Sequence, residues 1–110
     1  MDFEREIKRK LEAEGFAENN GKIIRVVNIL AGEWTPLSMI KSALENDMEG
    51  HAFDKSMLFL VKSGYLEIRG KRNRQAAEWE DRHRQELEVA LSGKGMKLAL
   101  YHITDEAVRV

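Results

Sequence analysis

Residues 51–74, HAFDKSMLFLVKSGYLEIRGKRNR, carry the clearest structural signal in the chain. Their first half repeats with a period of 3.6 residues, which places one set of side chains on a core-facing side of a helix: Phe53, Ser56, Met57, Leu60 and Val61. Gly64 then stands where a left-handed residue ends a helix. After it, Leu66 and Ile68 alternate with charged residues, as in a half-buried strand. We therefore expect a helix that stops at a glycine and turns directly into a strand.

The chain before this stretch is predicted to be helical. Residues 2–14 place Phe3, Ile7 and Leu11 on a narrow apolar stripe. A helix with such a stripe is not stable alone, so it is expected to dock on the body of the protein or on a second copy.

Two further helices are expected upstream of residue 51. Gly15 and the polar residues 18–21 predict a break and a turn, followed by a helix over residues 22–31. Thr35 with Pro36 predicts a capped helix start, and that helix should run to about Asn46.

The chain after residue 74 is predicted to contain a helix, a strand and a short final helix. Residues 76–92 place six side chains on one helical stripe: Ala76, Trp79, His83, Leu87, Ala90 and Leu91. Residues 92–95 should break this helix, and residues 96–103 then alternate as a second strand that pairs with residues 65–69. Thr104, followed by two acids, predicts the start of the last helix.

This order of elements resembles the winged helix-turn-helix family of DNA-binding domains. Residues 60–66, LVKSGYL, are similar to that family's passage from recognition helix to wing, and residues 101–104, YHIT, to the passage from the second wing strand to the next helix. The likeness covers about residues 22–108. It implies a mostly helical α+β fold, with a three-helix core, an antiparallel β-wing, an N-terminal helix and an extra helix inserted in the wing.

On this interpretation residues 1–110 are a single winged-helix domain. Its expected parts are the N-terminal helix (1–14), the helix-turn-helix core with the first wing strand (22–74), the inserted helix (75–95), and the second wing strand with the C-terminal helix (96–110).

Composition narrows the protein class. The chain has 110 residues, of which 43% are hydrophobic and 34% charged, and it contains no cysteine. Disulfides and thiolate zinc sites are therefore excluded. No apolar run is long enough to span a bilayer, and residues 1–10 lack the apolar centre of a signal peptide. We expect a cytoplasmic protein without a membrane partner.

The charge distribution allows only local binding to phosphate. The formal net charge is −1, but residues 35–74 hold seven basic and five acidic side chains. The family resemblance implies contacts with double-stranded DNA at the wing and the recognition helix. The candidate DNA-binding residues are Lys41, His51, Lys55, Lys62, Arg69, Lys71, Arg72 and Arg74. The alternative for the basic loop is a solvated tip.

Several apolar side chains are candidates for protein interaction: Leu58, Phe59, Trp79, Leu87 and Leu91. Leu58 and Phe59 face away from the core side of their helix, and such neighbours more often mark a packing surface than a DNA contact. The inserted helix, a second subunit or a protein partner could cover them. The stripe of residues 76–91 either packs on the body or pairs with its own copy in a homodimer, and His83 within it is expected to be a buried neutral imidazole.

Enzyme chemistry finds no support. The three histidines are scattered, and the glycines form no phosphate-binding loop, so neither a catalytic site, a metal nor a cofactor is expected. The leading prediction is a small DNA-binding protein, either a transcriptional regulator or an accessory DNA-binding factor. The alternative is a winged-helix adaptor for protein–protein interaction, such as a phage or plasmid component, with little DNA affinity.

Overall fold

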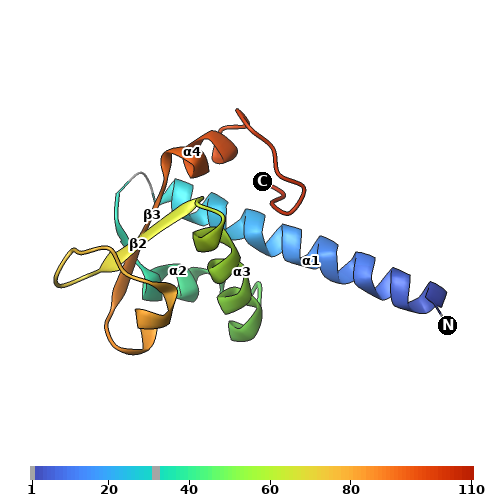
Figure 1. The fold of residues 1–110 in the computed structure, drawn as a ribbon, viewed down its shortest axis with the longest axis horizontal. Coiled ribbons are helices and arrows are strands. Elements are labelled where there is room, and N and C mark those ends of the chain that lie inside the picture. The colour runs from blue at the N-terminus through green and yellow to red at the C-terminus, as the bar shows by residue number, and fades with distance from the viewer. Residues whose placement is uncertain (1, 31–32) are drawn as a thin grey trace.

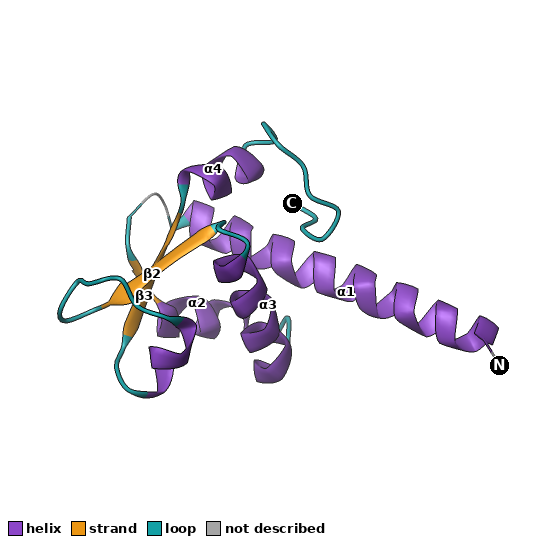
Figure 2. Cartoon of the chain, in the orientation of Figure 1, coloured by secondary structure: helices purple, strands orange, loops and turns teal. Residues whose placement is uncertain are grey.

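A computed structural model describes residues 2–30 and 33–110, so Met1, Ala31 and Gly32 lie outside the described residues. The chain folds into helices and a small sheet (Figures 1 and 2). The elements, in order, are α1 (Asp2–Ile29), β1 (Thr35–Pro36), α2 (Leu37–Leu44), α3 (Gly50–Lys62), β2 (Leu66–Gly70), the 3-10 helix η1 (Trp79–His83), β3 (Leu87–Leu91) and α4 (Gly93–Ala99). The expected α+β class with a largely helical chain is confirmed.

The sheet is antiparallel, with strand order β1-β3-β2. In β2 and β3, Leu66 pairs with Leu91 and Gly70 with Leu87, while Thr35 of β1 pairs with Val89 of β3. The inward side chains of β2 and β3 join the second half of α1, with α2 and α3, in one hydrophobic core. Because β3 pairs on both sides, it holds the start of α2 beside the connection between β2 and β3.

The central prediction, a helix that stops at a glycine and leads into a strand, is confirmed. Phe53, Met57 and Leu60 of α3 are buried in the core, Gly64 has a φ of +81°, and β2 follows directly. The helix predicted after Pro36 is also present as α2, but Thr35 belongs to β1 and does not cap it.

The first helix is longer than predicted. The break expected at Gly15 and the turn expected at residues 18–21 are wrong, because α1 runs through both. The expected helix end at Ala31 falls outside the described residues. Residues 2–14 are all exposed, and this half of α1 projects from the body (Figure 1).

The C-terminal segment, residues 105–110, explains the polar residues in the middle of α1. Asn20 donates from Nδ2 to the carbonyl oxygen of Ala107 at 2.8 Å, and the backbone N–H of Arg109 donates to the carbonyl oxygen of Ala17 at 3.0 Å. The pattern that predicted a turn is thus a docking surface on a continuous helix.

The helix predicted over residues 76–92 is wrong. A single stretch of 3-10 helix, η1, is followed by β3, in which Leu87, Val89 and Leu91 are buried at a period of two. Leu87 and Leu91 also fit an i, i+4 helical pattern, so their spacing alone does not separate the two structures. Pairing with β2 and β1 decides in favour of the strand.

The strand predicted over residues 96–103, and its pairing with residues 65–69, are wrong as well. Ser92 caps α4, since its Oγ accepts from the N–H of Gly95 at 3.0 Å. The residues expected to break a helix therefore begin one. Of the alternating apolar residues, Leu98 is buried whereas Met96 and Leu100 are exposed, which suits the single inward face of a short helix.

The predicted final helix is replaced by a turn in which Asp105 and Val108 form an isolated bridge. Asp105 also accepts a hydrogen bond at 2.5 Å from the hydroxyl of Tyr65, a buried residue directly before β2. The C-terminal segment is therefore tied both to α1 and to the sheet.

Two glycines of α1 provide a matched test of this docking. Alanine at Gly15 would meet nothing within 4 Å, whereas the Cβ of alanine at Gly21 would overlap the carbonyl of Arg109. We expect Gly15→Ala to stabilise the protein by up to about 1 kcal/mol through helix propensity. Gly21→Ala should instead lower the melting temperature and expose the C-terminal segment to protease. A Gly21→Ala variant as stable and as protease-resistant as Gly15→Ala would contradict the docking.

Tyr65 supplies a test at alkaline pH. Burial, together with the hydrogen bond and the charge of Asp105, raises the pKa of Tyr65 to about 12. Since the unfolded pKa is about 10, the neutral hydroxyl stabilises the fold fully below pH 10 and loses this contribution as the pH rises through 12. Denaturant titrations should show a fall of roughly 2–3 kcal/mol over that interval. The fall should be smaller by that amount in Tyr65→Phe, and parallel pH profiles for both proteins would refute the assignment.

Candidate nucleic-acid interface

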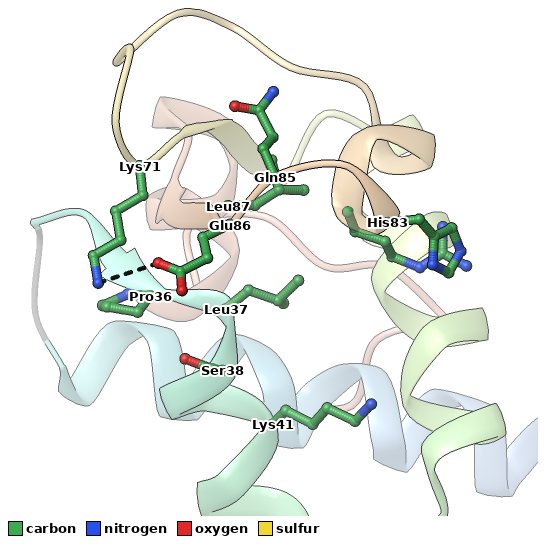
Figure 3. Close-up of a pocket in the computed structure, with 10 residues that line it drawn as sticks. Pro36, Leu37, Ser38, Lys41, Lys71, His83, Gln85, Glu86 and Leu87 are labelled. Atoms are coloured by element: carbon green, nitrogen blue, oxygen red, sulfur yellow. Dashed lines mark ion pairs between the residues drawn. The ribbon is translucent and has the colours of Figure 1, made fainter.

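An open cavity of about 450 Å³ lies where the start of α2 meets the connection between β2 and β3 (Figure 3). Pro36 is the N-cap of α2, and no side chain among the described residues caps this helix. The first amides of α2 are thus left for solvent or a ligand, at the positive end of the helix dipole. Pro36, Leu37 and Ser38 line this side of the cavity.

Basic side chains surround this helix start. Lys41 from α2, together with Lys71, Arg82 and His83 from the β2–β3 connection, lines the same cavity. A neighbouring cavity of about 300 Å³ adds Arg72 and Arg84 and shares Gln85 and Glu86 with the first. We call this surface the basic rim, and it consists of Lys41, Lys71, Arg72, Arg82, His83 and Arg84.

The rim contains one ion pair and one anchored arginine. Lys71 Nζ lies 3.6 Å from Glu86 Oε2, and both side chains are substantially exposed (Figure 3). Arg82 donates from Nη1 to the carbonyl oxygen of Trp79 at 3.1 Å, and its guanidinium lies 4.6 Å from the centre of that indole ring. Arg82 is therefore held in place at the rim, while the exposed pair of Lys71 and Glu86 is weak and can open.

Arg69 is engaged inside the chain. Its Nε donates to Glu88 Oε1 at 2.6 Å, and its guanidinium lies 4.1 Å from the centre of the Trp34 ring. The two charged side chains are only 23% and 12% exposed. The expectation that Arg69 contacts DNA therefore gives way to a structural role, in which it joins β2, β3 and the segment before β1.

The other predicted DNA contacts are spread over different surfaces. His51 and Lys55 of α3 lie beside α1, where Lys55 Nζ stands 5.3 Å from the centre of the Phe16 ring. Lys62 is exposed in the last turn of α3. Arg74, with a φ of 55°, lines a separate cavity next to Trp34. The structure thus brings together Lys41, Lys71 and Arg72 of the predicted set.

The residues proposed for protein interaction lie mostly inside the molecule. Trp79, Leu87 and Leu91 are buried in the core, so these side chains do not form a surface for a partner. Phe59 packs edge-on against Phe16 of α1, with ring centres 5.1 Å apart. Among the predicted set, Leu58 has the exposed side chain, at 38%.

Three rim residues were not predicted. Arg82 and Arg84 were not singled out from the sequence, and His83 was placed on the buried stripe of a helix over residues 76–92, whereas His83 is exposed. The adjacent triplet Arg82, His83 and Arg84 is itself a signal in the sequence. It indicates a cluster of cations beside α2 once this segment is known to be the loop there.

The described residues contain no group of three or more histidine or acidic side chains arranged to hold a metal ion. In that same part of the chain, no helix has the length and apolar character needed to cross a membrane. Comparison of the chain with models of protein families, with curated proteins and with solved structures finds no match.

Substituting Arg69 and Lys71 in turn tests whether Arg69 stabilises the fold while Lys71 is a surface residue. Removing the partly buried Arg69 leaves Glu88 unpaired, so Arg69→Ala should lower the free energy of unfolding by about 2 kcal/mol. Lys71→Ala should change it by less than about 0.5 kcal/mol, because the pair with Glu86 is exposed. Denaturant unfolding of both variants measures this, and equal effects would show that Arg69 is not anchored as described.

Proposed function

We propose that this chain is a winged helix-turn-helix protein that binds double-stranded DNA through the basic rim, as a transcriptional regulator or an accessory DNA-binding factor. The observation that carries the proposal is the convergence of cations from α2 and from the β2–β3 connection around the uncapped start of α2. A helix start surrounded by lysine and arginine suits phosphate oxygens, because backbone amides, helix dipole and full charges all favour an anion.

The architecture supports the same proposal. Helix, strand, helix, helix, strand, loop and strand follow one another from α1 to β3, and the sheet order is β1-β3-β2. This resembles a winged-helix domain in which α2 and α3 form the helix pair and residues 71–86 form the wing. Helix-turn-helix proteins commonly place the second helix in the major groove while the first crosses the backbone. The start of α2 would then meet phosphates.

The charge balance favours contact with the DNA backbone over a generally cationic mode of binding. The whole chain carries a formal charge of −1, so attraction must come from the rim itself. Arginine bonds phosphate with two parallel donors, and lysine supplies a compact charge. Glu86 opposes this attraction locally, since it lines both cavities and pairs with Lys71.

The exposed side of α3 suggests limited discrimination between sequences. Arginine, lysine, asparagine and glutamine most often read base edges in the major groove, and of these four residues 50–62 contain only lysine. The exposed positions offer His51, Lys55, Leu58 and Lys62. Backbone contacts fix position but carry no sequence information, so we expect binding that tolerates many sequences.

The adaptor alternative loses most of its proposed surface. Trp79, Leu87 and Leu91 are core residues, and Phe59 lies against Phe16. Leu58 alone makes a small apolar patch. The observation that does favour a protein partner lies elsewhere, on the projecting half of α1.

Titration of a random-sequence duplex over a range of salt concentrations tests the proposal. Each phosphate contact contributes about 0.9 to the slope of log affinity against log salt. Lys41→Ala, Arg72→Ala and Arg84→Ala should each weaken binding and reduce the slope by roughly that amount. Glu86→Gln should tighten binding, because it removes the opposing charge and frees Lys71.

Lys97→Ala is the matched control, since Lys97 is an exposed lysine on α4, away from the rim. Its affinity and slope should equal those of the unmodified protein. A chain that does not bind duplex DNA at low salt, or rim variants with the same slope as the control, would overturn the proposed function.

A further inference from the structure

The first half of α1 presents an apolar stripe to solvent. Phe3, Ile7 and Leu11 recur every fourth residue and are 70%, 43% and 63% exposed. Residues 2–14 are all exposed, in a helix that projects away from the core (Figure 1). Three large apolar side chains on one side of a solvated helix are the pattern of a helix that pairs with another helix.

We propose that this half of α1 binds the same segment of a second copy of the chain in an antiparallel pair. Phe3 of one copy packs beside Leu11 of the other, and the two Ile7 side chains meet at the two-fold axis. The stripe is symmetric about Ile7, with an apolar residue four positions to either side, as a self-complementary antiparallel contact requires. This inference goes beyond the proposed DNA binding and does not depend on it.

The charges beside the stripe select the antiparallel orientation. On a 3.6-residue helix, Glu4 and Lys8 lie along one edge of the stripe, and Glu6 and Lys10 along the other. In an antiparallel pair each edge meets the same edge of its partner with the order reversed. Glu4 then lies two positions in height from the partner copy's residue 8, and Glu6 two positions from its residue 10, which gives four acid–base contacts over the two edges. These outnumber the two like-charge contacts at the same offset, of the two Lys8 side chains with each other and of the two Glu6 side chains with each other.

A parallel pair would bring different edges together in the same order. Glu4 would face the acidic position 6 and Lys8 the basic position 10 of the other copy, so four like-charge contacts would outnumber the two acid–base contacts between Lys8 and Glu6. The two Glu14 side chains, which follow Leu11 on the stripe, would also lie beside each other. In the antiparallel pair the Glu14 positions are about 20 Å apart.

The acidic residues after Leu11 also limit the strength of the contact. Glu14 and Glu18 occupy the next positions of the stripe, so the apolar contact spans about 12 Å of helix. An interface of this size falls below that of a stable permanent dimer. We expect a dimer that dissociates in the micromolar range and places the two globular bodies at opposite ends of the helix pair.

Sedimentation equilibrium of the full chain from about 1 to 500 µM, a range that brackets weak association, tests whether the pair forms. The unmodified protein should shift from monomer to dimer. Ile7→Glu should weaken association by at least about 100-fold, because an isoleucine is lost from both copies at the axis. Leu100→Glu is the matched control, since Leu100 is 58% exposed after α4, and it should dimerise normally.

Introduced cysteines test the orientation, because the chain contains none of its own. A mixture of the Phe3→Cys and Leu11→Cys variants should oxidise to a mixed disulfide dimer. Each variant alone should stay largely uncrosslinked, since equivalent positions 3 or 11 lie about 12 Å apart in the antiparallel pair. A disulfide needs Cα atoms roughly 4.4–6.8 Å apart.

Each alternative outcome overturns a defined part of the proposal. A protein that stays monomeric over the whole range, or an Ile7→Glu variant that dimerises as well as Leu100→Glu, removes the α1 interface. Rapid self-crosslinking of each cysteine variant alone would mean a parallel pair. Since these residues lie outside the core and the basic rim, circular dichroism should show every variant folded, and duplex binding by the Ile7→Glu monomer reports on DNA binding separately.

Discussion

The two-sided pairing of β3 is the constraint on which the rest of this structure depends. β3 bonds to β2 over its full length and to β1 through Val89 and Glu88. β1 leads directly into α2, and β2 leads into residues 71–86. By holding both neighbours, β3 brings the start of a helix and a charged loop, separated by more than thirty positions in the sequence, to the same edge of the molecule.

The anion site that we propose at that edge depends on which cations are already paired within the described chain. Arg69, a residue of β2, is paired with Glu88 and lies against the Trp34 ring. Lys71 meets only the exposed carboxylate of Glu86. Partly buried charges thus stabilise the sheet, while exposed charges remain available. The difference follows from solvent exposure, since water screens the pair of Lys71 and Glu86 at the surface more than the partly buried pair of Arg69 and Glu88.

The sequence correctly predicted the parts of the fold that depend on neighbouring residues alone. α3, Gly64 and β2 were found because helical period, glycine stop and strand period agree over adjacent residues. Residues 87–91 were assigned to a helix because their apolar spacing fits both periods, and only the distant partner strands decide. Gly21 was assigned to a turn because a glycine in a polar run usually marks one. In the structure a glycine is needed there because the C-terminal segment, distant in the sequence, packs against it. Arg84 was missed for the same reason as residues 87–91, because only the pairing of β3 with distant strands places it beside α2.

If DNA meets the edge beside α2, as we propose, the backbone amides there report the contact directly. Titration of the isotopically labelled protein with a random-sequence duplex, followed by amide chemical-shift mapping, tests this claim without altering any side chain. We expect the largest shifts at Leu37, Ser38 and residues 71–72 and 82–85, with little change in α4. Shifts concentrated on α4 or on residues 2–14, with an unperturbed start of α2, would contradict it.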